Sequence, residues 1–190
     1  MMGYADYYLL LSPPEEVKQQ ISRYKKASIN KIGAFESMNS PAHISIVKTE
    51  RQKAFIVEPA FERMEKRLNT MPPIVLHING FNYFKHGDKA MSIYADIRQT
   101  DSVKKWFRLL FSCINVKHAS FTPHITIARN IHVSDFYTLW PHFEKAKYVE
   151  PFWIKELLVL KRETFTHEPK WSRYKTISFK NEFAALAEKI

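Results

Sequence analysis

Two short stretches of the sequence carry the residues best suited to chemistry, and they share one pattern. His43 begins the stretch His-Ile-Ser-Ile-Val-Lys, and His124 begins the stretch His-Ile-Thr-Ile-Ala-Arg. Each stretch therefore has a hydroxyl two residues after a histidine and a cation five residues after it. Histidine titrates near neutral pH, and Ser and Thr hydroxyls donate and accept hydrogen bonds. The repeat predicts a site with two acid–base groups and two hydroxyl groups.

The spacing within each stretch is that of a β-strand with one polar and one apolar face. Residues i and i+2 of a strand point to the same side, so His43 shares a face with Ser45, and His124 shares one with Thr126. The opposite faces carry isoleucines, at positions 44, 46, 125 and 127. We therefore expect two strands whose isoleucines enter the core and whose histidines line a cleft.

Phosphodiester chemistry uses this set of groups. In-line displacement at phosphorus has an entering and a leaving oxygen on opposite sides, so one imidazole can take a proton from the nucleophile while an imidazolium gives one to the leaving group. Each contribution is typically worth about 10²–10⁴-fold. The hydroxyls can hold the non-bridging oxygens in the transition state. We expect no cofactor and no metal site, because no other histidine pair has a metalloprotease-like spacing.

The composition favours a protein that binds anions. The chain has 190 residues, with 29 Lys and Arg against 19 Asp and Glu, and a formal net charge of +10. This charge attracts nucleic acid and other phosphates, whereas no basic amphipathic stretch supports the rival, an anionic membrane surface. There is no Gly-rich phosphate loop, so side chains must bind the phosphate. We interpret three basic pairs as solvated faces that add to the field: Lys25-Lys26, Lys104-Lys105 and Lys161-Arg162.

The single cysteine and the hydropathy of the chain favour a cytoplasmic protein. Cys113 cannot form an intramolecular disulfide or a zinc set, and we expect it to be a small residue of a helix that packs in the protein core. No apolar run has the length of a membrane span, and the first residues lack the features of a signal peptide. We expect a monomer that does not bind a membrane.

The order of expected helices and strands repeats once along the chain. Apolar periodicity, prolines and capping signals at Ser12 and Thr100 predict strand, helix, histidine strand, helix and strand in each half. In the first half these are residues 4–11, 15–35, 42–47, 52–68 and 74–84. In the second half they are residues 91–97, 102–115, 122–128, 134–146 and 152–160. A further strand at 174–179 and a C-terminal helix at 181–190 follow.

This repetition predicts an α+β fold with two pseudo-symmetric lobes. Each lobe is expected to be a mainly antiparallel sheet with helices on its outer face, and the two lobes to form one bilobal domain over residues 1–190. The approximate lobes are residues 1–86 and 87–180. Equivalent residues of two such lobes face each other across the cleft between them, which places His43 opposite His124.

The two motifs resemble those of the two-histidine phosphoesterase superfamily. The closer match is Phe121-Thr-Pro-His-Ile-Thr-Ile-Ala-Arg129, since the family typically has an aromatic residue, Pro-His-x-Thr and a following Arg. The other match is His43-Ile-Ser-Ile, which departs from the family in having Ser where Thr is more usual. It also has Val47-Lys48-Thr49 in place of a Phe-Leu-Gly-like run. Bacterial members are named 2'-5' RNA ligases and act as RNA 2',3'-cyclic phosphodiesterases.

The resemblance implies roles for the four motif residues. His43 and His124 would be the catalytic acid and base, with His43 near the leaving 3'-oxygen and His124 near the attacking water. Ser45 and Thr126 would bind the phosphate. The implied activity is metal-independent hydrolysis of a 2',3'-cyclic phosphate on RNA or a nucleotide to a 2'-phosphate, and 2'-5' RNA ligation is the reverse reaction.

Other functions remain open at this point. A 2'-5'-oligoadenylate phosphodiesterase or a cyclase-like nucleotide enzyme would use the same residues. A non-catalytic protein that binds RNA ends would show salt-dependent binding without turnover. A metal-dependent hydrolase would lose its activity with a chelator.

Four further residues are candidates for substrate binding. Arg129 belongs to the family motif, yet strand alternation places it on the face opposite to His124, unless the strand ends or bulges or Arg129 is structural; the same holds for Lys48. Phe84 resembles an aromatic that commonly ends the third strand of the first lobe in this family, and Phe121 flanks the second motif. Either aromatic could stack on a base or belong to the core.

Overall fold

The structure is a computed structural model that describes residues 3–117 and 120–181. The expected helix at 181–190 thus lies, apart from Asn181, outside the described residues. The strands are β1 (Tyr4–Leu11), β2 (Ile44–Lys53), β3 (Ile74–His86), β4 (Ala90–Ile97), β5 (His124–His132), β6 (Val149–Ile154), β7 (Glu156–Glu163) and β8 (Ser172–Ser178). The helices are α1 (Glu15–Ile32), α2 (Ala54–Leu68), α3 (Asp101–Cys113) and α4 (Val133–Lys145).

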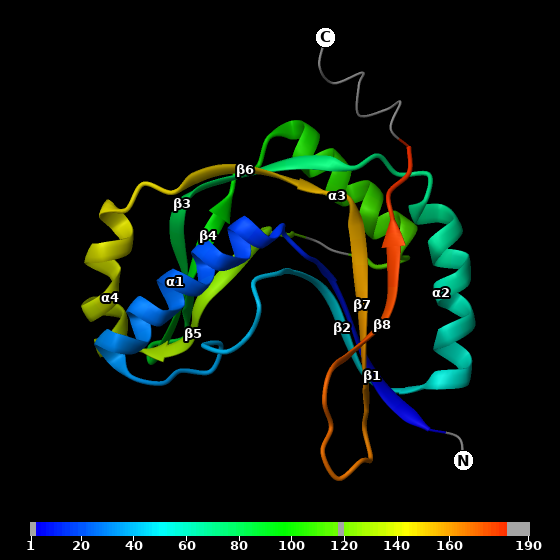
Figure 1. The fold of residues 1–190 in the computed structure, drawn as a ribbon, viewed down its shortest axis with the longest axis horizontal. Helices are drawn as coiled ribbons and strands as arrows, with labels where there is room; N and C mark the ends of the chain where they lie inside the picture. Colours follow the sequence, from blue (N-terminus) through cyan, green and yellow to red (C-terminus); the bar gives the residue numbers. More distant parts are fainter. Residues whose placement is uncertain (1–2, 118–119, 182–190) are drawn as a thin grey trace.

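The strands form two antiparallel sheets, which confirms the predicted α+β fold. One sheet has the order β2-β1-β7-β8 and the other has the order β5-β4-β3-β6. Helices α1 and α4 lie beside the second sheet, and α2 and α3 lie on the other side of the molecule (Figure 1). The two histidine strands, β2 and β5, occupy equivalent edge positions and contact each other.

The sheets do not follow the two halves of the chain. Strand β3 of the first half pairs with β4, whereas β7 and β8 of the second half join the sheet of β1 and β2. The division between the sheets therefore does not coincide with the approximate lobe boundary expected near residue 86. The exchange ties the two lobes together through backbone hydrogen bonds.

The single strand expected at 152–160 is wrong, because this segment contains two strands in different sheets. Strand β6 pairs with β3, and β7 pairs with β1. The buried positions are Phe152 and Ile154 before the break, and Leu157 and Val159 after it. The inward-facing positions change from even to odd numbers at Lys155, where the chain passes from one sheet to the other.

Local signals at the helix starts were right in one case and wrong in another. The Thr100 hydroxyl accepts a hydrogen bond from the Val103 N–H at 3.2 Å and caps α3, as expected. Ser12 does not cap α1, whose N-cap residue is Pro14 in an extended conformation without a side-chain bond. Two consecutive prolines, which lack N–H donors and have a fixed φ, separate Ser12 from the helix, which begins at Glu15 as expected. None of the helices in the described ranges is long and apolar enough to span a membrane.

Candidate active site

The two motif histidines lie at equivalent positions, at or next to the start of an edge strand, and each ring is oriented by a backbone carbonyl. Nδ1 of His43 lies 2.8 Å from the carbonyl oxygen of Pro41, and Nδ1 of His124 lies 2.8 Å from that of Thr122. A carbonyl oxygen can only accept a hydrogen bond, so in both rings Nδ1 carries the hydrogen and is the donor. This assignment leaves Nε2 of each neutral ring as the atom that can accept a proton.

Both histidine strands contain a β-bulge three residues after the histidine. In the β1–β2 ladder, Leu10 pairs with Ser45 and Leu9 with Val47, so Ile46 is the extra residue. In the β4–β5 ladder, Tyr94 pairs with Thr126 and Ile93 with Ala128, so Ile127 is the extra residue. A bulge reverses the alternation of side chains beyond it. The duplication therefore extends from the side chains to the backbone.

The bulges place Arg129 and Lys48 on the same face of their strands as the motif histidines. Ile127 and Ala128 are both fully buried, and Arg129 returns to the face of His124 and Thr126 and lines the cavity between the motifs. Lys48 pairs with Tyr8 of β1 and so lies on the cleft side of β2. Its ammonium, however, contacts Glu50 at 2.6 Å. Strand alternation alone is wrong at both positions.

A cavity of about 100 Å³ lies between the two motifs. It brings together His43 from the first motif with Thr126 and Arg129 from the second. Its remaining lining residues are Tyr8, Lys25, Glu36, Ser37 and Ser40. Glu36 is exposed and is the one carboxylate in this lining, against two cations. The cavity is therefore suited to an anion that meets side chains from both lobes.

Ser37 links the loop before β2 to strand β5. Its hydroxyl donates to the carbonyl oxygen of Ile127 at 3.1 Å and accepts from the N–H of Arg129 at 3.0 Å. The loop that leads to His43 is thereby fixed to the bulge that orients Arg129. This link sets the position of one motif relative to the other.

Comparison with known proteins identifies the family. Residues 13–164 match the sequence model described as the 2'-5' RNA ligase superfamily. The chain belongs to this superfamily. The resemblance to two-histidine phosphoesterases is thus confirmed over most of the chain. No curated protein shows significant sequence similarity to it.

Solved structures of the superfamily fold share the architecture at low sequence identity. TT0787 of Thermus thermophilus is 12% identical, with coverage of 93% of this chain and 99% of that one and a TM-score of 0.62. E. coli LigT complexed with phosphate is 12% identical, with coverage of 93% and 98% and a TM-score of 0.58. Kluyveromyces marxianus Usb1 with uridine monophosphate is 11% identical, with coverage of 92% and 98% and a TM-score of 0.51.

Tyr8 lies in the candidate site and is not among the residues expected from the sequence. Its hydroxyl lies 2.9 Å from Nε2 of His43 and also contacts Oγ of Ser45. Its ring packs at a tilt against Trp171, with 5.8 Å between the ring centroids. Finding Tyr8 requires the register between β1 and β2, which the sequence of one strand does not contain. The hydroxyl can donate to a neutral His43 ring and accept from a protonated one.

Lys25 is the second missed residue, and its interpretation as part of a solvated face is wrong. The residue is only 4% exposed, and its ammonium donates to the carbonyl oxygens of Ser37 at 2.8 Å and Ser40 at 2.7 Å. Burial, followed by the charge of Arg129, lowers the pKa of Lys25 to about 8. The available signal is its position four residues after the buried Ile21 on the inner face of α1.

The aromatic candidates have different surroundings. Phe84 stacks on Tyr94 with ring centroids 4.3 Å apart, and both rings lie 5.0 Å from the ring of His124. Phe121 packs instead against Phe107 and Phe111 of α3, at 4.9 Å from each ring. The structure therefore places Phe84 beside the motif histidine and Phe121 in the packing of a helix.

Burial and nearby cations lower the pKa of both motif histidines. For His43 the main cause is burial, followed among the charges by Lys25, Arg129 and His124. For His124 the main cause is burial, and the charge that contributes is Arg129. Both imidazoles therefore favour the neutral state in the free protein. Within the described part of the chain, no group of three or more His, Cys, Asp or Glu residues could hold a metal ion.

Proposed function

We propose that this protein is a metal-independent phosphoesterase that hydrolyses 2',3'-cyclic phosphates on RNA or nucleotides to 2'-phosphates. The observation that carries the proposal is the duplicated motif, in which histidine, hydroxyl and bulge recur on two edge strands that contact each other. Membership of the superfamily supports phosphoester chemistry. The structures of LigT with phosphate and with 3'-AMP, and of Usb1 with uridine monophosphate, support a phosphate or nucleotide ligand.

In the proposed reaction, His124 is the general base and His43 is the general acid. Water attacks the phosphorus, and Nε2 of His124 takes a proton from it. The bond between phosphorus and the 3'-oxygen breaks, and His43 gives its proton to that oxygen. The product has a 2'-phosphate and a free 3'-hydroxyl, and the two imidazoles have exchanged protonation states. Ligation would follow the same steps with a 5'-hydroxyl in place of water, and its product would be a 2'-5' phosphodiester with a free 3'-hydroxyl.

The surrounding groups suit the charge changes of this reaction. Ser45 and Thr126 can donate hydrogen bonds to the non-bridging oxygens, and Arg129 and Lys25 supply positive charge at the cavity wall. The same cations lower the pKa of His43 and so disfavour its imidazolium form. A bound phosphate anion offsets their charge, so substrate binding itself favours the protonated His43 that the reaction needs. The Tyr8 hydroxyl accepts from this ring when it is protonated.

The experiment uses a short RNA that ends in a 2',3'-cyclic phosphate, incubated in EDTA with the wild type, His43→Ala or His124→Ala. Separation of 2'- and 3'-phosphate ends reports the bond that breaks. We expect the wild type to form a 2'-phosphate and each variant to be slower by about 10²–10⁴-fold. Thermal unfolding of the variants controls for loss of structure.

Each other result has a defined meaning. Equal turnover by the wild type and both variants contradicts the acid–base assignment. Turnover that EDTA abolishes indicates a metal-dependent hydrolase. If the cyclic end is bound but never opened, 2'-5'-linked oligoadenylate is the next substrate, and failure there as well indicates a non-catalytic RNA-end-binding protein.

A further inference from the structure

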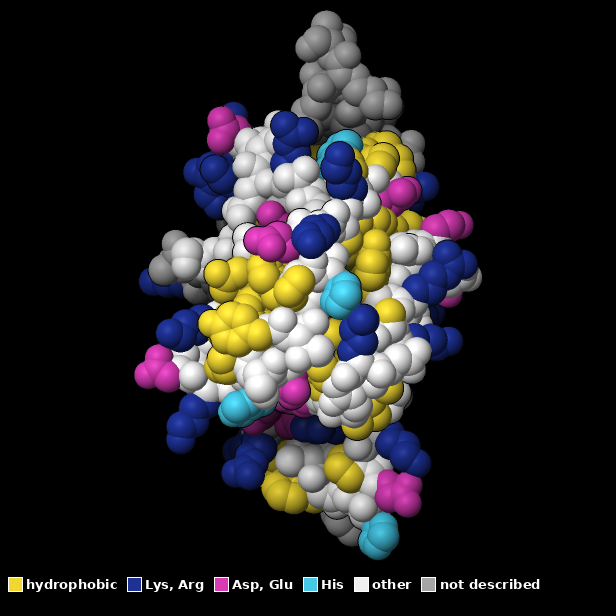
Figure 2. All heavy atoms as spheres, turned by 90° about the vertical axis from the view of Figure 1, so that its left-hand side faces the viewer, with side chains coloured by type: hydrophobic (Ala, Val, Ile, Leu, Met, Phe, Trp, Pro, Cys, Tyr) yellow, Lys and Arg dark blue, Asp and Glu magenta, His cyan; other side chains and the backbone are white. Residues whose placement is uncertain are grey.

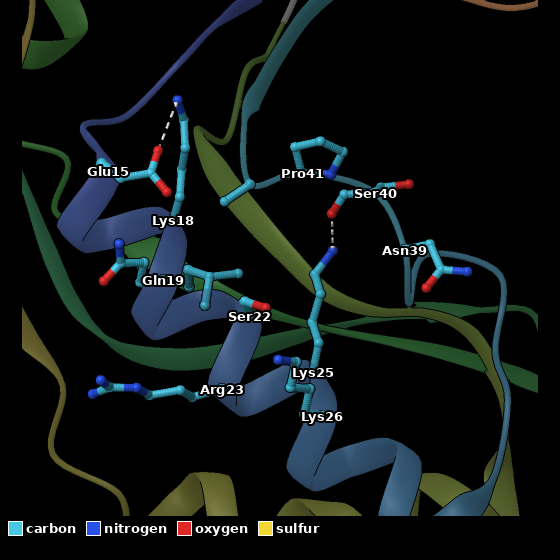
Figure 3. A pocket seen from close by; sticks show the side chains of 12 residues that line it. Glu15, Lys18, Gln19, Ser22, Arg23, Lys25, Lys26, Asn39, Ser40 and Pro41 are labelled. Carbon is cyan, nitrogen blue, oxygen red and sulfur yellow. Dashed lines mark hydrogen bonds and ion pairs between the residues drawn. The ribbon is translucent and has the colours of Figure 1, made fainter.

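A second, larger cavity adjoins the candidate active site along α1. Its volume is about 520 Å³, within the range of about 300–1,000 Å³ that is typical of small-molecule and cofactor sites. One wall is α1, and the other is the segment from Asn39 to Ala42 that leads to His43. Figure 3 shows the space between this segment and the helix. We call this cavity the α1 groove.

The α1 groove is lined mainly by basic and polar side chains. Lys18, Ser22 and Lys26 follow one another at intervals of four residues and therefore share a face of the helix. The one acidic lining residue is Glu15, whose carboxylate lies 3.9 Å from the ammonium of Lys18. Such exposed ion pairs contribute only about 0–1 kcal/mol, so an incoming phosphate can compete for Lys18. The lining favours an anion with hydrogen-bond acceptors.

The location of the groove is more informative than its charge. Figure 2 shows Lys and Arg side chains spread over one face of the molecule instead of gathered in a single patch, so charge alone does not mark a binding surface. The α1 groove, however, shares Lys25 and Ser40 with the smaller cavity that His43, Thr126 and Arg129 line. An anionic ligand can therefore extend from one cavity into the other.

Lys25 connects the two cavities chemically. Figure 3 shows its side chain reaching from α1 to Ser40. An ammonium has three N–H donors, and the two described acceptors are the carbonyl oxygens of Ser37 and Ser40. No carboxylate of the described residues forms an ion pair with this buried cation. A phosphate at the junction would supply both a third acceptor and the missing negative charge.

We propose that the α1 groove binds the RNA chain on the 5' side of the reacting end, with its phosphates near Lys25, Lys18 and Lys26. The inference rests on the proposed function, because a 2',3'-cyclic end continues only in the 5' direction. The substrate is accordingly an oligonucleotide of two or more nucleotides in preference to a mononucleotide. The groove holds the next nucleotide while the histidines act on the terminal phosphate.

The test measures binding of a reaction product, so it does not depend on turnover. A fluorescent RNA hexamer ending in a 2'-phosphate is titrated with the wild type and with the Lys18→Ala/Lys26→Ala double variant at several salt concentrations. Uridine 2'-monophosphate is measured by competition. The control is Lys31→Ala/Lys66→Ala, which removes the same charge from exposed helix positions outside the groove.

We expect the groove variant to bind the hexamer about tenfold more weakly. Loss of two phosphate contacts lowers the slope of log K against log salt by about 1.4, at roughly 0.7 per contact for a single strand. Binding of the mononucleotide and the behaviour of the control stay close to wild type. A hexamer affinity and salt slope equal to wild type, or reduced equally in the control, would overturn the proposal. Failure of the hydrolysis assay alone would leave this result unchanged, so the two proposals are separable.

Discussion

The two copies of the histidine motif occupy different environments. Around His43 the neighbours are polar: the Tyr8 hydroxyl reaches both Nε2 and the Ser45 hydroxyl, and Lys25 lies close enough to lower the pKa of the ring. Around His124 the neighbours are the rings of Phe84 and Tyr94. The two copies therefore share the bulged backbone and the histidine and hydroxyl side chains, and they differ in the residues around them.

This difference in surroundings fits different roles for the two histidines in the proposed reaction, although their backbone positions are equivalent. A hydroxyl that can either donate or accept suits an imidazole that must arrive protonated and leave neutral. An aromatic wall suits the side on which a base or ribose packs. We therefore associate proton delivery with the His43 side and nucleoside contact with the His124 side.

The largest expected effect distinguishes the roles of the two histidines by means of a substrate with a different leaving group. A 3'-deoxynucleoside 2'-(4-nitrophenyl phosphate) releases a phenolate that needs no proton, so a general acid is not required. We expect His43→Ala to lose about 10²–10⁴-fold on the cyclic phosphate and to regain most of that loss on this substrate. His124→Ala should be slow on both, as followed by nitrophenolate absorbance. Rescue of His124→Ala instead would exchange the two roles.

The predictable part of this site lies in short repeated patterns. Period-two alternation correctly predicts that Ile44, Ile46, Ile125 and Ile127 enter the core. The repeated histidines predict two equivalent strands, and the structure has them at equivalent sheet edges. Such features depend on neighbours along the chain, which the sequence contains directly.

The second expected effect removes the aromatic wall. Phe84→Ala should raise KM for an RNA or nucleotide substrate, because loss of base–aromatic stacking costs about 1–3 kcal/mol. This corresponds to a rise of roughly 5- to 150-fold. The matched control is Tyr83→Ala on the same strand, since the Tyr83 ring contacts Phe136 and Trp140 of α4. A similar KM for both variants would show that Phe84 does not contact the substrate.

The third expected effect concerns the polar side. Tyr8→Phe keeps the ring but removes the hydroxyl that contacts His43 and Ser45. At about 0.5–1.5 kcal/mol for a typical hydrogen bond, we expect kcat/KM to fall by roughly threefold to tenfold. Tyr94→Phe is the control, because Tyr94 contacts His124 with its ring. Equal effects of the two substitutions would show that the Tyr8 hydroxyl has no special role.

The features that could not be predicted depend on partners distant in the chain. Arg129 reaches the cavity because a bulge in the β4–β5 ladder shifts it, and a bulge is defined by the register with the opposite strand. Lys25 can be buried because two carbonyl oxygens of the following loop accept hydrogen bonds from its ammonium. The change of sheet at Lys155 depends on β1 and β3 both having a free edge for pairing. A local sequence pattern contains no information on these contacts between distant parts of the chain.

The smallest expected effect compares the electrostatics of the two histidines directly. After burial, Lys25 and Arg129 both lower the pKa of His43, whereas Arg129 is the cation that lowers the pKa of His124. Lys25→Gln removes one charge but keeps a donor for the two carbonyls, so the pKa of His43 should rise while that of His124 stays constant. Arg129→Gln should raise the pKa of both rings. Because a raised pKa extends the protonated state to higher pH, the NMR midpoint of each affected imidazole moves upward. If Lys25→Gln moved both midpoints equally, Lys25 would act on the whole cavity and the two sides would not be electrostatically distinct.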